Sequence, residues 1–496
     1  MSPLPKGEVR LYFVLWSCCF LYAMLKVHEG GNLLKSAMYS GDFSPGWPIF
    51  QREKDVSDFE WFLWTGLCFK LLPWFGLHLF LCELMRRIDS EALPILHFTL
   101  TISFVSFSFP LLFPLILIFQ FSVFFVVMIF GSRAFVWTLG VTFIILINLN
   151  YNTLGRLLQL SEEEVSLVAV AWSWFHIRCI DFALSEVHSC ESTVKKFLSF
   201  LGFVFYLPCF LLGPLIPYKT FKENLFCPYK PWTFDRGAVL AFDLFRVLVW
   251  YVVYEAGSHF FYCHAMHYHI DELVRLGLWT VGGVGLCMSQ FFFIKYVVLY
   301  GFSIAIAKAE RYDAPPTPRC VNRIYLYSDM WRHFDRGFYL FMFSSIYRPV
   351  CGRDVTKLSL RLFASFLCFC FVFLWHGINK TIFIWSVLNF VGVALEAVGR
   401  IAAKTRAYGR FESSIDPRNM RRLKAVVCTP LWIMAVVSNF VFFGGHELGQ
   451  VYIEQVVGGD FKVLFSLFSM GYFMCQVSME ASLYKKDCIK NVNEQL

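Results

Sequence analysis

The stretch VRLYFVLWSCCFLYAMLKV, residues 9–27, is an apolar run whose two charged residues, Arg10 and Lys26, lie next to its ends. A run of about 18 or more apolar residues is long enough to cross a bilayer as a helix. This run is longer than the core of a typical signal peptide, and no small-residue cleavage site is obvious. We therefore expect it to be a first membrane helix that the protein retains.

Apolar runs of similar length recur along the rest of the chain. They span residues 60–84, 94–117, 119–148, 164–184, 196–216, 237–262, 276–307, 361–376, 380–399, 425–445 and 461–482. Charged residues make up 16% of the chain, against about 25% in an ordinary soluble domain. Only helices or closed barrels span lipid, and these runs are too long for barrel strands. The pattern predicts an all-α multi-pass membrane protein with about 10–12 membrane helices and re-entrant elements.

The stretches between the runs are short and polar, so they predict loops and short interfacial helices. No low-complexity linker divides the chain, and no internal repeat is clear. We therefore expect residues 1–496 to form a single domain. A transporter or channel would favour inverted repeats with broken helices in matching halves, and the sequence does not show them clearly.

Basic residues outnumber acidic residues by 44 to 36, which gives a formal net charge of +8. Residues 404–424 hold seven Lys or Arg and two acids. Short basic loops of membrane proteins face the cytosol. The segment predicts a cytosolic loop beside membrane lipids, and nucleic acid is not expected as a partner.

The chain has 17 cysteines, most of them inside apolar runs, as at Cys18, Cys19, Cys368 and Cys370. Buried cysteine behaves as a small hydrophobe. The sequence has no CxxC pair and predicts no disulfide framework. Its one glycosylation sequon, at Asn379, lies too close to membrane-depth sequence to be a good acceptor.

Polar groups inside membrane segments are costly, so each one suggests a function. The run WSWFHIRCIDFAL, residues 172–184, contains His176, Arg178 and Asp181. Arg178 and Asp181 are three residues apart and can share one helix face. An internal ion pair that fixes helix packing is the simplest interpretation, and substrate binding is the alternative.

His259, Cys263 and His267 recur every four residues, a spacing that would suit a metal on one helix face. They lie at the end of an apolar run, and no second ligand cluster of matching spacing follows. A structural or interfacial role is the better interpretation, and the sequence predicts no metal site.

Three glycines in TVGGVGLC, residues 280–287, faintly resemble a phosphate loop. The stretch lacks the preceding strand and the following Lys-Ser/Thr that such a loop needs. Small residues that let membrane helices pack closely explain the glycines better.

A single histidine, His376, ends the apolar run FVFLWH, and Gly377 follows it. The polar stretch YSDMWRHFDRGFY, residues 327–339, precedes this run. On periodicity alone, His376 is either a catalytic group or a packing residue whose imidazole is satisfied by a carbonyl.

The exact residue sequences of several segments are more informative than their hydrophobic periodicity. The stretches PRCVNRIYLYSDMWRHFDRGFY (318–339), FVFLWHG (371–377) and WSVLNFVGVALE (385–396) closely resemble the membrane-bound O-acyltransferase family. Within this family they resemble the branch that acylates hedgehog-like proteins. LLGPLIPYKTF (211–221) and SQFFFIKYVVLYGFSIA (289–305) are similar as well.

The resemblance implies a many-helix core around a central tunnel, which acyl-CoA enters from the cytosol and the protein acceptor enters from the lumen. It implies that His376 and Asp335 are catalytic, and that Trp331 and Arg332 line the acyl-CoA site. It also implies a location in the endoplasmic reticulum membrane, with the Golgi membrane as the alternative.

The reaction implied by the resemblance is transfer of palmitate from palmitoyl-CoA to the N-terminal cysteine amine of a secreted signalling protein, hedgehog-like or EGF-like. A serine O-acyltransferase of the same family and a non-catalytic relative that binds lipid or protein are the alternatives. We expect no permanently bound cofactor. Haem is not expected, because the cysteine that is linked to haem in the vertebrate branch corresponds to Ile384, which has no thiolate.

Overall fold

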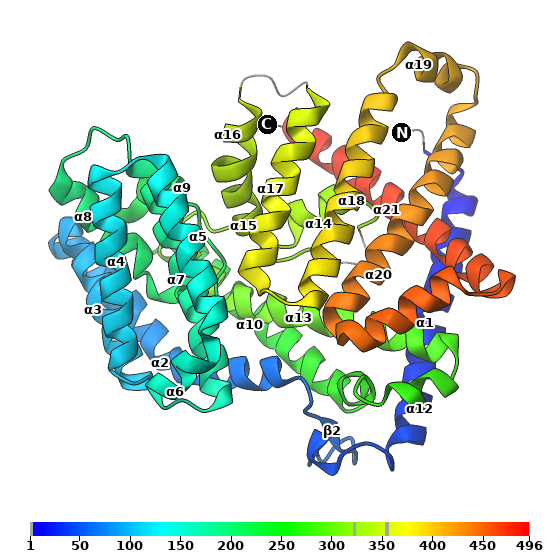
Figure 1. The fold of residues 1–496 in the computed structure, drawn as a ribbon, viewed down its shortest axis with the longest axis horizontal. Helices are drawn as coiled ribbons and strands as arrows, with labels where there is room; N and C mark the ends of the chain where they lie inside the picture. The colour runs from blue at the N-terminus through cyan, green and yellow to red at the C-terminus, as the bar shows by residue number, and fades with distance from the viewer. Residues whose placement is uncertain (1–2, 321–323, 353–356, 496) are drawn as a thin grey trace.

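The computed structural model describes residues 3–320, 324–352 and 357–495, and these are almost entirely helical (Figure 1). The helices are α1 (Lys6–Leu34), α2 (Phe59–Ile88), α3 (Leu93–Ser108), α4 (Leu112–Phe130), α5 (Arg133–Leu149), α6 (Tyr151–Leu158), α7 (Glu162–Glu186), α8 (Thr193–Val204), α9 (Tyr218–Leu225), α10 (Phe234–Ser258), α11 (Cys263–Met266), α12 (Ile270–Arg275), α13 (Leu278–Ala309), α14 (Tyr327–His333), α15 (Arg336–Met342), α16 (Arg348–Cys351), α17 (Leu358–His376), α18 (Lys380–Ala402), α19 (Arg406–Ser413), α20 (Pro417–Val457) and α21 (Phe461–Gln495). Two short strands, β1 (Phe43–Ser44) and β2 (Lys54–Asp55), form an antiparallel pair in the loop between α1 and α2.

The prediction of an all-α multi-pass membrane protein is confirmed. In the part of the chain that the structure describes, eleven helices are long and apolar enough to cross a membrane, or twelve if the bent pair α5–α6 counts as one span. Three predicted runs were wrong in detail. Residues 94–117 contain the break between α3 and α4, and residues 119–148 contain the break after Phe130 between α4 and α5. Residues 196–216 include only the short helix α8 before the chain becomes irregular.

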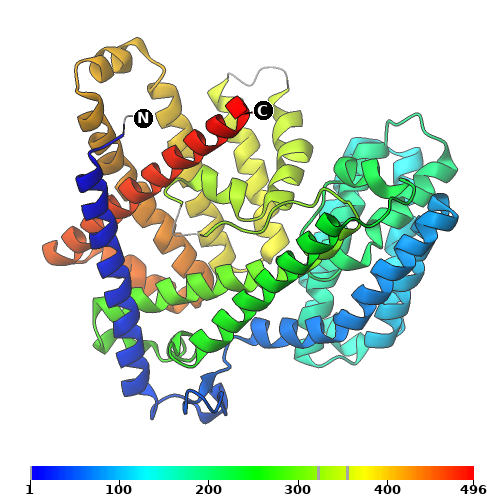
Figure 2. The same cartoon turned by 180° about the vertical axis from the view of Figure 1, so that it is seen from behind.

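Helix α13 lies at the centre of the molecule. Helices α3 to α9 gather on one side of it, and α1 with α17 to α21 lie on the other, as Figures 1 and 2 show from opposite directions. The predicted role of the glycine run in close packing agrees with the structure. A Cβ added at Gly283 would lie 2.7 Å from the Ala23 carbonyl oxygen of α1, and one at Gly285 would lie 2.6 Å from the Phe440 ring of α20.

The expected ion pair between Arg178 and Asp181 is not formed, although both side chains are buried. Arg178 donates to the carbonyl oxygens of Val204 (3.3 Å) and Tyr206 (3.5 Å), while Asp181 accepts a hydrogen bond from the Tyr218 amide (2.7 Å). The charged groups instead hold the irregular segment after α8 against α7. This is physically reasonable because an irregular backbone at membrane depth needs partners for its free polar groups.

The segment around His259 does not place its three candidate ligands on one continuous helix. Helix α10 ends at Ser258, so His259, Cys263 and His267 do not share one helix face. The His259 Nδ1 is bonded to the Glu255 carbonyl oxygen (2.7 Å), and its Nε2 accepts from the Trp47 amide (2.8 Å). Both ring nitrogens are therefore occupied by backbone groups.

Helix α1 connects the two ends of the molecule. Near its start, Glu8 pairs with Arg422 of α20 (2.5 Å), close to α19. Near its end, a Cβ at Gly30 would touch Met266 and Leu276, which flank α12. At 29 residues the helix is roughly 43 Å long, which exceeds the hydrocarbon thickness of a bilayer. In Figure 1, α19 and α12 accordingly lie at opposite ends of the molecule.

This arrangement gives a topology test. Because residues 404–424 are basic, we expect α19 to face the cytosol and α12 to face the lumen. A cysteine introduced at exposed Ser414 should react with an impermeant thiol reagent on intact sealed microsomes. A cysteine at exposed Asp271 should react only after the vesicles are opened. Labelling is compared with the unmodified chain, and the reverse pattern would reject the predicted orientation.

Candidate active site

A cavity of about 940 Å³ opens between the helices near the middle of α13. Its walls come from α1, the start of α2, α5 to α7, α13 to α15, α17, α18, α20 and α21. The walls are mainly apolar and aromatic. The volume is at the upper end of the range of about 300–1,000 Å³ that is usual for ligand pockets, so the cavity is large enough for an extended ligand.

His376 lies on the wall of this cavity, at the last residue of α17. The helix ends there because Gly377 has φ +118° and ψ +141°. Residues other than glycine rarely adopt this backbone conformation. Asn148 of α5 holds the turn from both sides. Its amide nitrogen donates to the Leu374 carbonyl (3.1 Å), and its oxygen accepts from the Ile378 amide (3.2 Å). The position of the histidine is thus fixed by backbone contacts.

The imidazole of His376 is surrounded by aromatic rings. Trp385 of α18 lies edge-on at 5.2 Å between ring centroids, and Phe442 of α20 does so at 5.8 Å. Within the described part of the chain, neither ring nitrogen has a hydrogen-bond partner, and the side chain is open to the cavity. A packing histidine would have both nitrogens bonded to protein groups, as His176 has through Gln120 and the Gly140 carbonyl, and as His259 has through the Glu255 carbonyl and the Trp47 amide. His376 is therefore free to exchange a proton with a ligand.

Asp335 lies on the wall of the same cavity, as the residue that caps α15. One carboxyl oxygen accepts from the Phe338 amide (2.9 Å), and the other accepts from the hydroxyl of Tyr300 on α13 (2.8 Å). Burial raises the pKa of Asp335, and the hydrogen bonds from Phe338 and Tyr300 oppose this shift. Among the described residues, no Lys or Arg forms an ion pair with Asp335, and no hydrogen bond joins it to His376.

Of the two residues that were expected to line an acyl-CoA site, only one faces the cavity. Trp331 of α14 faces the cavity, donates to Asn389 (3.0 Å) and lies 5.5 Å from the Trp385 ring. Arg332 is exposed and is not part of the cavity wall; its guanidinium lies 3.5 Å from Asp329 and 6.0 Å from the centre of the Tyr339 ring. The guanidinium can therefore meet a ligand only outside the cavity.

The charged groups of the cavity wall are all acidic. Glu60 and Asp335 contribute carboxylates, and the described wall includes no Lys or Arg. Glu60 is compensated by Lys295 (2.7 Å), so Asp335 is the carboxylate without a cationic partner. Opposite charges attract strongly where water is scarce. The cavity can thus hold a cationic group beside Asp335 and can pass a proton to His376.

Sequence reasoning missed the residues that support His376, Asp335 and Trp331. Asn148, Tyr300 and Asn389 act through contacts between helices that are far apart in the chain. The signal that could have found them is their position, because each is a polar residue inside an apolar run.

Comparisons with known proteins identify the same family of relatives over most of the chain. Residues 134–437 match the sequence profile described as MBOAT, membrane-bound O-acyltransferase family. The chain is 30% identical over 463 residues to protein-cysteine N-palmitoyltransferase Rasp of Drosophila melanogaster, and the match covers 90% of each protein. It is 29% identical over 269 residues, 54% of each protein, to protein-cysteine N-palmitoyltransferase HHAT of Mus musculus. A mouse HHAT-like protein is 23% identical over 478 residues, 92% of this chain and 91% of that protein.

The turn after His376 gives a stability test. We expect Gly377→Ala to lower the free energy of unfolding by about 1–3 kcal/mol, because alanine is strained at this φ. Space is not the cause, since the nearest atoms to an added Cβ are 3.6 and 3.7 Å away. The control is Gly399→Ala inside α18, where nothing lies within 4 Å and alanine favours the helix. Thermal unfolding in detergent should separate the two variants, and equal melting temperatures would contradict the assignment of strain.

Proposed function

Because the chain belongs to the membrane-bound O-acyltransferase family, we propose that this acyltransferase moves palmitate from palmitoyl-CoA to the N-terminal cysteine amine of a secreted signalling protein, hedgehog-like or EGF-like. The observation that carries the proposal concerns the described residues: Asp335 without an ion-pair partner and His376 without a hydrogen-bond partner line one cavity, and its described wall includes no Lys or Arg. Such a cavity favours a substrate that arrives as a cation and leaves a proton behind.

An N-terminal amine is such a substrate. Its pKa is about 7.7–8.0, so much of it is protonated at neutral pH. In the proposed reaction Asp335 attracts the ammonium group, and His376 removes a proton from it. The amine then attacks the thioester carbonyl, a C–N bond forms, and the C–S bond breaks. The CoA thiolate that leaves takes up the second proton of the attacking nitrogen, so the products are an amide and free CoA, and the proton on His376 passes to solvent.

The two parts of palmitoyl-CoA suit different places. The acyl chain matches the aromatic and apolar wall, since each buried methylene contributes roughly 0.8 kcal/mol. The phosphates do not match a wall whose charged groups are acidic. We propose that they lie outside the cavity, where exposed Arg332 can bind them, while Trp331 contacts the donor near the thioester.

The proposed substrates also suggest in which cellular membrane the protein lies. A cytosolic donor and a secreted acceptor meet in the endoplasmic reticulum membrane, and the Golgi membrane is the alternative. The expected orientation supports this proposal, because it places basic residues 404–424 on the donor side.

The function is tested with purified protein, labelled palmitoyl-CoA and three acceptor peptides. We expect labelling of a peptide that begins with free Cys, and little labelling when the first residue is Ser or N-acetylated Cys. The label should resist neutral hydroxylamine, which cleaves thioesters and leaves amides intact. His376→Ala should lower turnover by about 10²–10⁴-fold without loss of the folded protein.

Each rival makes a different prediction in the same experiment. A serine O-acyltransferase would label the Ser peptide, and a non-catalytic relative would bind the donor without transferring the label. Label that is lost in hydroxylamine, or an acetylated peptide that is labelled as well as the free one, would falsify the amide mechanism.

The hydrogen bond from Tyr300 to Asp335 gives a pH test. This bond stabilises the charged carboxylate, so its loss in Tyr300→Phe should raise the pKa of Asp335 further. If the ionised form is the active one, the acidic limb of kcat/KM should move to higher pH. Since a hydrogen bond to a charged group contributes about 1.5–3 kcal/mol, the acidic limb should move by about one to two pH units.

Tyr254→Phe is the matched control for this pH test. Tyr254 also donates to an aspartate, Asp58 (2.5 Å), but neither residue belongs to the cavity wall. Its removal should leave the acidic limb in place. An unchanged limb in the Tyr300→Phe protein would show that Asp335 does not act as the charged group.

A further inference from the structure

Away from the cavity, three possible metal ligands meet in a buried position between α2 and α3. The side chains of His78, Cys82 and His97 offer ligand atoms that all lie within 4.8 Å of one another. His78 and His97 have no exposed surface, and Cys82 is 1% exposed. Imidazole and thiolate are the groups that zinc prefers in proteins.

Both histidines are oriented in the same way. The Nδ1 of His78 lies 2.9 Å from a carboxylate oxygen of Glu310, and the Nδ1 of His97 lies 2.9 Å from the Gly202 carbonyl oxygen. A carboxylate and a carbonyl only accept hydrogen bonds, so each Nδ1 carries the proton. Each Nε2 is then left with a free lone pair. Histidines that bind metals show this arrangement, with one nitrogen on an acceptor and the other on the metal.

The two Nε2 atoms and the sulfur lie close enough together for one ion to bind all three. Among the described residues, the buried Nε2 of His97 has no hydrogen-bond partner, which costs about 1–3 kcal/mol if nothing fills the position. The Cys82 sulfur lies beside the His78 ring, 3.6 Å from its Nδ1 and 3.7 Å from its Nε2. Tetrahedral zinc, with Zn–N of about 2.0–2.1 Å and Zn–S of about 2.3 Å, places such atoms about 3.6 Å apart.

We propose that His78, Cys82 and His97 form a zinc site, with Nε2, Sγ and Nε2 as the ligand atoms. Binding releases the thiol proton of Cys82, because the thiolate is the ligand. The charges then balance, since the thiolate and the carboxylate of Glu310 together offset the two positive charges of zinc. Glu310 also accepts from the Tyr206 hydroxyl (2.5 Å), and this second contact fixes the carboxylate that orients His78.

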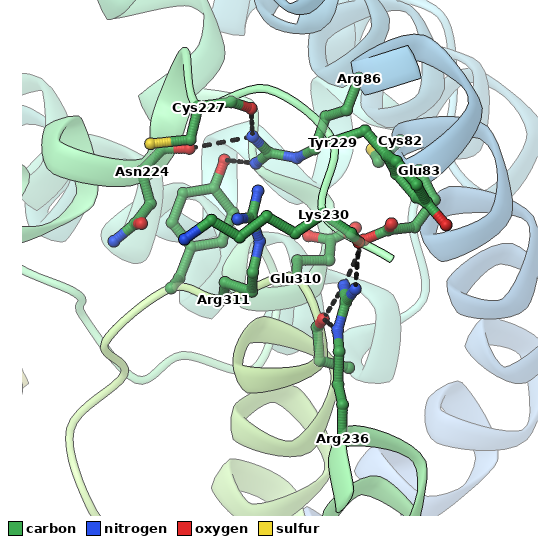
Figure 3. Close-up of polar contacts among 12 residues, drawn as sticks. Cys82, Glu83, Arg86, Asn224, Cys227, Tyr229, Lys230, Arg236, Glu310 and Arg311 are labelled. Atoms are coloured by element: carbon green, nitrogen blue, oxygen red, sulfur yellow. Dashed lines mark hydrogen bonds and ion pairs between the residues drawn. The ribbon is translucent and has the colours of Figure 1, made fainter. Parts of the chain in front are cut away.

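The position of the site indicates a structural role. It joins α2, α3, the end of α8 and, through Glu310, the end of α13, the helix that also carries Tyr300. Figure 3 shows Cys82 and Glu310 close to a second set of polar contacts that tie the same helix ends. There Arg86 donates to the Asn224 and Cys227 carbonyls, and Arg236 bonds Glu83 and the Ala309 carbonyl.

The first test is the metal content of the full-length protein, purified without chelators and then equilibrated with Zn²⁺ and desalted. We expect one zinc ion per chain in the wild type, and its loss in Cys82→Ser and His97→Gln. Cys287→Ser is the matched control, because Cys287 is also a buried thiol of a membrane helix but has no histidine beside it in the described contacts. Glu310→Gln should weaken zinc binding by about 10–100-fold.

The second test needs no variant and so does not depend on the variants folding. Cobalt(II) in place of zinc should give the wild type a thiolate-to-cobalt charge-transfer band, and a chelator should lower its melting temperature until Zn²⁺ is restored. Wild-type protein with no more zinc than the Cys82→Ser protein, or with copper or iron in the position, overturns the proposal. A cobalt complex without the thiolate band, or a melting temperature that the chelator leaves unchanged, also overturns it.

Discussion

Polar groups in the core of a bilayer have no water to bond with, and the rest of this structure depends on that constraint. The buried polar side chains of α7 obey it closely. His176 is held between Gln120 and the Gly140 carbonyl, and Arg178 and Asp181 serve the backbone of the segment that follows α8. Most such groups are paired with protein atoms. The nitrogens of His376 and the Nε2 of His97 have no hydrogen-bond partner among the described residues, so they are the best indications of where a ligand binds.

Much of the fold could be predicted from the sequence, because the lengths of apolar runs reflect the thickness of the membrane. The breaks inside runs could not, as at Gly131, since a glycine alone does not say whether a helix ends. The same limit applies to the metal-like spacing at His259. Its four-residue spacing assumed a continuous helix, whereas the chain leaves the helix after Ser258.

The candidate site was only partly accessible from the sequence. Family resemblance pointed to His376 and Asp335, but their place on one cavity follows from the packing of α13, α15 and α17. Trp331 and Arg332 are adjacent in sequence, yet successive residues of a helix point about 100° apart, and only the tryptophan faces the cavity. The four-residue spacing of His78 and Cys82 was visible in the sequence, but the third member, His97, comes from the neighbouring helix.

The aromatic wall of the large cavity also bears on permeability. An enclosed space among membrane-spanning helices is a risk to the compartment, because a continuous file of water would conduct ions and protons. Narrow apolar passages empty of water oppose such conduction. The rings of Trp385, Phe442 and their neighbours around His376 offer little to hydrate an ion. The same surface that would accept a hydrocarbon chain in the proposed reaction thus helps the membrane to remain an electrical barrier.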